Sequence, residues 1–155
     1  MGKRMAWLIV VLWMLLIFYF SHQPVFESRE LSTMITKRLI EIGENVTPIE
    51  NVKLDQIHHF VRKNAHFNIY FFLGIFTMLA LKISGVKGNR SVVIVLIICI
   101  IYAVTDEFHQ LFVLGRGAQL KDVIIDLVGA TTGIATASLI GMRRKSRMAN
   151  LNKGL

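Results

Sequence analysis

The stretch from residue 106 to residue 133 reads DEFHQLFVLGRGAQLKDVIIDLVGATTG, and it joins two strongly apolar segments of the chain. One apolar run, 92–104, precedes this stretch, and the other, 123–140, overlaps its end. A bilayer interior disfavours a charged side chain by roughly 3 kcal/mol. The acids and the arginine of this stretch must therefore lie near a membrane interface or face a polar interior. The stretch predicts a polar site at the ends of two membrane spans.

The composition of the whole chain also indicates a membrane protein. Hydrophobic residues make up 54% of the 155 residues, and the mean hydropathy is +0.54. The net charge of +8 sits beside apolar runs, so it indicates membrane topology and contact with anionic lipid; no nucleic-acid partner is expected. The single Cys99 lies in an apolar run and cannot form an internal disulfide. We expect one integral membrane domain over residues 1–155, with the lipid bilayer as its partner.

Four apolar runs have nearly the length of about 20 residues that a helix needs to cross a bilayer. They are residues 6–21, 64–83, 91–110 and 122–142. The first is slightly short and could be a signal peptide, but no small-residue cleavage site follows it, so we interpret it as a retained span. The predicted fold class is all-α, a four-helix transmembrane bundle.

The segment between the first and second spans predicts an amphipathic helix over about residues 28–43. Apolar residues recur there at helical spacing, namely Leu31, Met34, Ile35, Leu39 and Ile42. We expect this helix to lie on the extracytoplasmic membrane surface or to cap the bundle. A further helix is expected to begin near Asp55 and to continue into the second span. The basic tail from Arg143 onward is expected to fray.

The distribution of charge predicts the orientation of the chain. The two termini and the turn between the second and third spans carry ten Lys and Arg residues and no acid. Basic segments without acids stay in the cytoplasm, so both termini should be cytoplasmic. The polar ends of all four spans would then meet on the extracytoplasmic side.

The candidate site residues share this depth and come from every span. They are Ser21, Gln23, Lys63, His66, Tyr70, Asp106, Glu107, Gln110, Arg116, Asp122 and Asp126. Helical spacing puts the polar residues of the second span on one face, and it does the same for Asp106 with Gln110 and for Asp122 with Asp126. Gly129 and Gly133 continue the face of the fourth span and predict close helix packing there.

Taken singly, most of these residues have an ordinary structural explanation, such as capping, snorkelling or hydrogen bonding within the bundle. The four acids together do not, because buried like charges repel and lose hydration unless cations or protons compensate them. We expect Arg116, the Asp106/Glu107 pair and His66 to form one electrostatic unit. A purely structural salt-bridge network remains the alternative.

Several short motifs together resemble the VanZ-like membrane family, named after a protein linked to teicoplanin resistance. They are KNAHF followed by Tyr70 and Leu73-Gly74, DEFHQ followed by Phe112 and Gly115-Arg116, and Asp122, Asp126, Gly129 and Gly133 of the fourth span, with Ser21 and Gln23 ending the first span. This chain has Ile69 where many relatives carry an acid, and Leu114 where proline is common. The resemblance implies a bacterial cell-membrane protein with a role in the cell envelope.

Two classes of function fit these residues. The first is a binding or modulating protein whose pocket holds a lipid headgroup, a cell-wall precursor or a lipoglycopeptide, and which lowers glycopeptide susceptibility. The second is an intramembrane enzyme acting on a lipid-linked or phosphate-bearing substrate with His66 as a base or with a divalent metal ion. The metal-ligand candidates are His66, Asp106, Glu107, Asp122 and Asp126. A proton-coupled carrier is disfavoured, because the four spans contain no visible inverted repeat.

Overall fold

The structure is a computed structural model that describes residues 2–24, 33–34 and 51–153. It contains four long helices in this part of the chain, which are α1 Lys3–His22, α3 Asn51–Ile83, α4 Asn89–Gln110 and α5 Leu120–Lys153. No strand occurs among the described residues, so the all-α prediction is confirmed. The expected amphipathic helix at 28–43 lies outside the described residues, apart from the helical Thr33 and Met34.

Each long helix contains a segment that is long and apolar enough to cross a membrane. These segments are Lys3–His22, Phe60–Ile83, Asn89–Gln110 and Leu120–Gly141. The bounds of these segments agree with those of the four predicted spans to within four residues at every end. Large apolar side chains such as Leu12, Ile101 and Ile124 are exposed on the outside of the bundle. Such a surface suits lipid, in which these side chains need no further protein cover.

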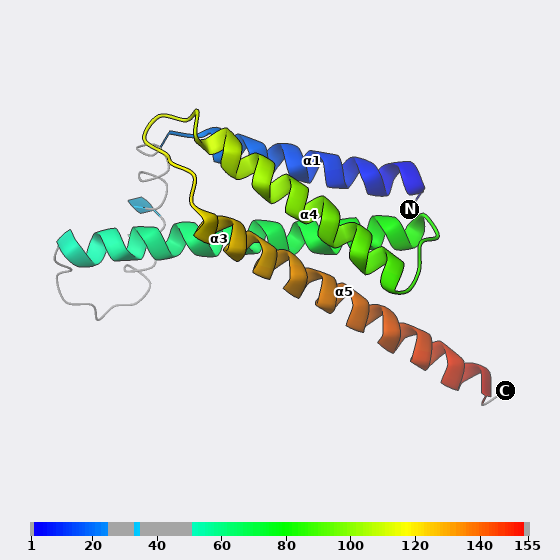
Figure 1. The fold of residues 1–155 in the computed structure, drawn as a ribbon. Helices are drawn as coiled ribbons and strands as arrows, with labels where there is room; N and C mark the ends of the chain where they lie inside the picture. The colour runs from blue at the N-terminus through cyan, green and yellow to red at the C-terminus, as the bar shows by residue number, and fades with distance from the viewer. Residues whose placement is uncertain (1, 25–32, 35–50, 154–155) are drawn as a thin grey trace.

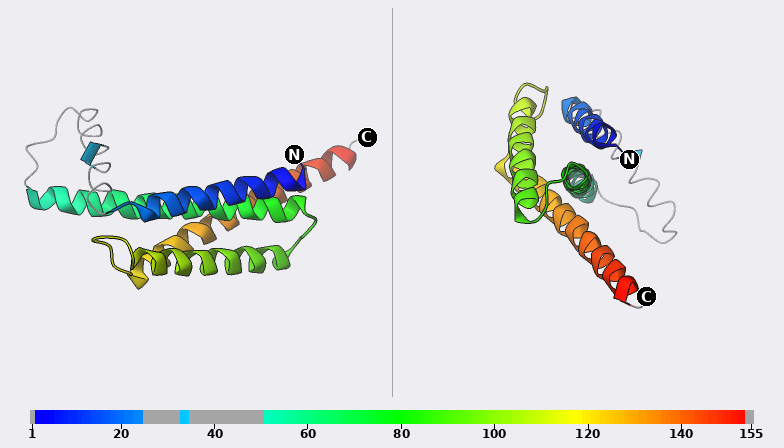
Figure 2. Two further views of the ribbon diagram at one scale, coloured as in Figure 1. Left: turned by 90° about the horizontal axis from the view of Figure 1, so that it is seen from above. Right: turned by 90° about the vertical axis from the view of Figure 1, so that its right-hand side faces the viewer.

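Helix α3 is the centre of the bundle and contacts each of the other three long helices (Figures 1 and 2). Its most extensive contact is with α5, which crosses it obliquely. Tyr70 and Leu73 of α3 are fully buried in the core together with Val95 and Cys99 of α4 and Ala130 of α5. The burial of Cys99 fits a small apolar core residue.

Three glycines allow α3 and α5 to approach closely. A Cβ atom on Gly129 would collide with the carbonyl oxygen of Phe67, and one on Gly133 would collide with that of Phe71. A Cβ on Gly74 of α3 would likewise collide with the backbone of α5. Because the acids of α5 lie one and two turns before Gly129 on the same face, the close contact brings them against α3.

Two helices extend beyond their membrane segments. Helix α3 begins at Asn51 and runs without a break into the span, close to the start expected near Asp55. Helix α5 continues through Lys153, so the expectation that the basic tail frays from Arg143 was wrong. The physical reason is intrinsic propensity, since Arg, Lys, Met and Ala are good helix formers even without a core to pack against. The end of α5 projects past the other helices (Figure 1).

Side-chain hydrogen bonds fix α1 to the rest of the bundle. The Trp13 Nε1 donates to the carbonyl oxygen of Ile69 at 2.9 Å, and the Trp7 Nε1 donates to the Ser84 Oγ at 3.0 Å. Hydrogen bonds of this kind stabilise helix association where the hydrophobic effect is weak. The connection 84–88 between α3 and α4 is tight, with Gly85 at φ 94° and Gly88 at φ 70°, a backbone conformation that favours glycine.

Candidate functional site

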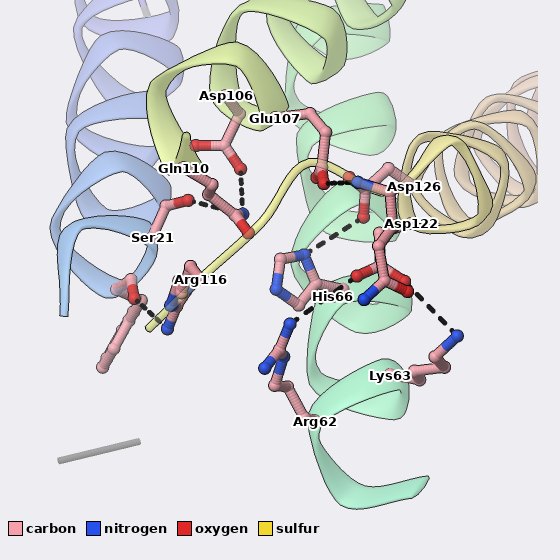
Figure 3. Close-up of polar contacts among 12 residues, drawn as sticks. Ser21, Arg62, Lys63, His66, Asp106, Glu107, Gln110, Arg116, Asp122 and Asp126 are labelled. Carbon is pink, nitrogen blue, oxygen red and sulfur yellow. Dashed lines mark hydrogen bonds and ion pairs between the residues drawn. The ribbon is translucent and has the colours of Figure 1, made fainter. Parts of the chain in front are cut away.

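A polar cluster lies at one end of the bundle, where α1 and α4 end, α5 begins and a turn of α3 passes between them (Figures 1 and 3). We define it by the labelled side chains of Figure 3, which are Ser21, Arg62, Lys63, His66, Asp106, Glu107, Gln110, Arg116, Asp122 and Asp126. Segments far apart in the sequence thus bring four acids, a histidine and three basic side chains to one place.

The four acids of the polar cluster are all buried. None of Asp106, Glu107, Asp122 and Asp126 is more than 5% exposed. A buried carboxylate without compensation costs several kcal/mol, on the order of the whole net stability of a small domain. The partners of each acid therefore decide what the cluster is built to do.

Asp122 has the most complete compensation. Its carboxylate lies 3.4 Å from the Nζ of Lys63 and 3.7 Å from a guanidinium nitrogen of Arg62. It also stands in the first turn of α5, where the helix dipole favours a negative charge. Asp122 thus ties the start of α5 to α3 and holds two basic side chains at the edge of the cluster.

Glu107 and Asp106 make polar contacts from the last turns of α4. Glu107 accepts a hydrogen bond from the backbone N–H of Gln119, which fixes the connection 111–119 before α5. The Gln110 Nε2 donates to the Ser21 Oγ at 2.8 Å and lies 3.5 Å from the Asp106 Oδ2. Each acid keeps one buried oxygen without a hydrogen bond among the described residues.

Asp126 is the most isolated of the four acids. It is fully buried, and neither of its carboxylate oxygens accepts a hydrogen bond within the described part of the chain. The Nδ1 of His66 lies 3.4 Å from its Oδ1. Each of His66, Asp106 and Asp126 offers one possible metal-ligand atom, and these three atoms lie within 4.8 Å of one another. Of the five metal-ligand candidates, the structure gathers these three, whereas Glu107 and Asp122 bond elsewhere.

The guanidinium of Arg116 makes no hydrogen bond to Asp106 or Glu107 among the described contacts, although its charge acts on both acids. It instead donates to the carbonyl oxygen of Phe20 at 3.3 Å. The physical reason is that the last carbonyls of α1 have no partner within their helix and carry partial negative charge. The expected electrostatic unit of Arg116 and the two acids with His66 stays a prediction.

Two further nitrogens of the half-buried Arg116 guanidinium, Nε and NH1, are buried and have no hydrogen-bond partner among the residues that the structure describes. Burial, followed by the nearby charge of Arg62, lowers the pKa of Arg116. The guanidinium nevertheless stays charged at physiological pH. Gly115, at φ 76°, gives the connection the turn that directs this side chain back over the helix ends.

Two predicted site residues lie apart from these contacts. Gln23 is half-buried at the C-terminal cap of α1, and no described contact links it to the polar cluster. Tyr70 lies one turn along α3 from His66, fully buried, with a hydroxyl that has no partner among the described residues. Its ring packs near that of Tyr102, with centroids 6.3 Å apart.

Sequence reasoning missed Arg62 and the histidine pair beside the cluster. Arg62 stands four residues before His66, a spacing that puts both on one helix face and could have identified it. The Nδ1 of His22 lies 3.0 Å from the Nε2 of His109 at the exposed ends of α1 and α4. No spacing rule connects these two histidines, because they lie on different helices.

The four apolar helices and the polar end that they share define a multi-pass α-helical membrane protein. The family model described as VanZ/LLP1 matches residues 6–141, and the chain belongs to this family. The match contains every residue of the polar cluster. Searches of curated proteins and of solved structures found no match.

Proposed function

We propose that this VanZ-like protein resides in a bacterial plasma membrane and uses its polar cluster to bind the anionic headgroup of a cell-envelope component. The charge distribution of the chain supports an orientation with both termini in the cytoplasm. In that orientation the polar cluster opens to the extracytoplasmic side, where envelope lipids and cell-wall precursors are found.

The observation that carries the proposal is the Arg116 guanidinium, two of whose nitrogens are buried with no hydrogen-bond partner in the described part of the chain. A buried donor without a partner is costly, and such groups in folded proteins call for a ligand or water. The guanidinium fork binds a phosphate or carboxylate at two points. Arg62 lies near enough for its charge to act on Arg116, so the two like charges favour an anion between or beside them.

Exposed apolar side chains around Arg116 support an amphipathic ligand. Phe112, Leu114 and Leu120 are each at least 75% exposed in and beside the connection that carries Arg116. These side chains suit the boundary between headgroups and acyl chains, where an apolar body and a polar tip can both be satisfied. A lipid with a phosphate headgroup offers both features to this end of the bundle.

An enzyme that acts on a lipid-linked phosphate ester is a second candidate. It is favoured by His66, whose Nδ1 is 3.4 Å from a carboxylate oxygen of Asp126. A carboxylate that orients an imidazole is the arrangement by which histidine serves as a general base. Binding of the headgroup by Arg116 would be the first step of either function.

The proposal is tested by lipid binding to purified protein. A short-chain phosphatidic acid is the probe, and native mass spectrometry or a competition assay measures its affinity. Arg116→Lys keeps the charge and loses the fork, so the affinity should fall roughly tenfold or more, the effect of losing a charge-assisted hydrogen bond. The control is Lys121→Ala, which removes an exposed cation close by in the sequence. Equal affinities for wild type and Arg116→Lys would contradict the proposal.

A cellular measurement addresses the envelope role. We propose that expression lowers susceptibility to teicoplanin, as the family resemblance implies. The Arg116→Lys, His66→Ala and Asp106→Asn variants should each lose the effect at matched membrane levels. A wild-type phenotype in all three would show that the polar cluster does not act on the envelope.

A further inference from the structure

We infer that His66, Asp106 and Asp126 form a binding site for a divalent transition-metal ion, held by one imidazole and two carboxylates from three different helices. This site goes beyond the headgroup proposal and does not depend on it, because the anion is assigned to other side chains of the polar cluster. The positions and the burial of the three residues support this site, as do the partners that the two carboxylates lack among the described residues.

The distances suit metal coordination. Ligands at about 2.1 Å from a tetrahedral metal lie about 3.4 Å from each other. The Nδ1 of His66 and the Oδ1 of Asp126 are 3.4 Å apart. One possible ligand atom of Asp106 lies within 4.8 Å of one such atom of His66 and one of Asp126, so side-chain rearrangement would be needed to bring all three ligands to coordination distance.

The two carboxylates lack the partners that buried acids require. Asp126 is fully buried and its oxygens accept no hydrogen bond among the described residues, and Asp106 is 3% exposed with its Oδ1 unpaired. Two ionised carboxylates and one imidazole carry a net negative charge even when the imidazole is protonated. A divalent cation would neutralise the three groups, which no other described contact does.

No lysine or arginine of the polar cluster forms an ion pair with Asp106 or Asp126 in the described part of the chain. Arg62 and Lys63 pair with Asp122, and Arg116 donates to the carbonyl oxygen of Phe20. Buried charges in a folded protein are paired or coordinate metal. Asp122 is paired in this way, whereas Asp126 has His66 as its one ion-pair partner in the described part of the chain. A metal ion would supply the further positive charge that the two buried acids Asp106 and Asp126 lack.

The helix arrangement also suits a metal. His66 lies on α3, Asp106 on α4 and Asp126 on α5, and metal sites in helical bundles are built from inward-facing side chains of neighbouring helices. The close contact at Gly129, one turn after Asp126, brings α5 and α3 together at this level. One nitrogen and two oxygen ligands suit Zn²⁺ or Mn²⁺ better than Mg²⁺ or Ca²⁺, which prefer oxygen ligands alone.

The test measures metal bound to full-length protein in detergent, without added lipid. Chelator-treated protein is equilibrated with ZnCl₂, MnCl₂ or MgCl₂, desalted and analysed by elemental mass spectrometry. We expect about one Zn²⁺ or Mn²⁺ per chain, little Mg²⁺, and a higher melting temperature with the bound metal. Asp126→Asn and His66→Gln should reduce the bound metal at least tenfold, the usual scale for losing a ligand's contribution to affinity.

The matched control is Asp122→Asn, the same chemical change one turn earlier on α5. Its carboxylate pairs with Arg62 and Lys63, so this variant should retain the metal. Absence of stoichiometric metal in wild type, or equal loss in Asp122→Asn and Asp126→Asn, would overturn the inference. If Asp126→Asn does not fold, pulsed electron paramagnetic resonance of Mn²⁺-loaded wild type decides, because a coordinated imidazole gives a nitrogen coupling and its absence contradicts the site.

The outcome separates this inference from the headgroup proposal. If the wild-type protein binds neither Zn²⁺ nor Mn²⁺ but its lipid affinity depends on Arg116, only the metal-site inference is contradicted. If the wild-type protein binds stoichiometric metal but Arg116→Lys leaves its affinity for phosphatidic acid unchanged, only the headgroup proposal is contradicted.

Discussion

Gln110 links two helices through one side-chain amide. Its Nε2 donates to the Ser21 Oγ of α1 at 2.8 Å and lies 3.5 Å from the Asp106 Oδ2 on its own helix. The residue is fully buried, so neither contact can be replaced by bulk water. The amide therefore supports the position of Asp106, one of the three residues of the inferred metal site.

We predict that Gln110→Leu destabilises the protein by about 1–3 kcal/mol, because it leaves a buried carboxylate oxygen and a buried hydroxyl without their donor. Ser21→Ala removes only one of the two contacts and should cost about 1 kcal/mol. Thermal unfolding of both variants in the same detergent measures the difference. A loss for Ser21→Ala as large as that for Gln110→Leu would show that the amide does not hold Asp106.

The sequence predicted which residues lie in the polar cluster better than it predicted which residue each of them contacts. Ten of the eleven predicted site residues lie in the polar cluster or, like Tyr70, next to it. The reason is that the apolar interior of the membrane disfavours charged side chains, which gather at the ends of the spans. The choice of partner depends on distances that spacing along one helix does not determine. Arg116 therefore contacts the carbonyl of Phe20 instead of an acid, and Arg62 takes the role of a partner for Asp122.

The contact of α3 with α5 depends on backbone proximity. Gly133 lies so close to Phe71 and Ile75 that an added Cβ would meet backbone atoms, which cannot move without shifting the helix. Gly141, two turns further along α5, would place its Cβ 2.9 Å from the Nζ of Lys82, the mobile end of a long side chain.

We predict opposite effects for alanine at these two glycines. Gly133→Ala should destabilise the bundle by about 1–3 kcal/mol through overpacking. Gly141→Ala should be neutral or stabilise by up to about 1 kcal/mol, because alanine favours the helix and the lysine can move aside. Melting temperatures in detergent measure both. Equal shifts of the same sign would count against the close helix contact.

The bounds of the helices were predictable in the membrane segments, where bilayer thickness determines the length of apolar helix. The four membrane segments match the apolar runs because a fixed hydrocarbon thickness requires a fixed length of apolar helix. The extensions of α3 to Asn51 and of α5 to Lys153 lie in polar sequence. Hydropathy does not mark a helix end there, so only propensity could have indicated the continuation beyond Arg143.

The whole molecule has two chemically different ends. One contains the polar cluster with all four intramembrane acids, and the other contains the turn 84–88 and leads to the basic end of α5. This polarity was readable from sequence, since the predicted site residues lie at the end of the first and third spans and at the start of the second and fourth. The grouping of His66 with two acids was not, because it depends on the crossing of α5 over α3 at the glycine contact.

If the four spans bring their polar residues together at the extracytoplasmic face, single cysteines at the two ends of the bundle should differ in accessibility from outside the cell. In a Cys99→Ala background, Ala118→Cys places a thiol in the exposed connection beside the polar cluster, and Lys87→Cys places one in the exposed turn at the other end. Permeabilised cells, in which both thiols should react, are the control. We predict that an impermeant maleimide labels Ala118→Cys on intact cells and leaves Lys87→Cys unlabelled. Labelling of Lys87→Cys with protection of Ala118→Cys would contradict this account.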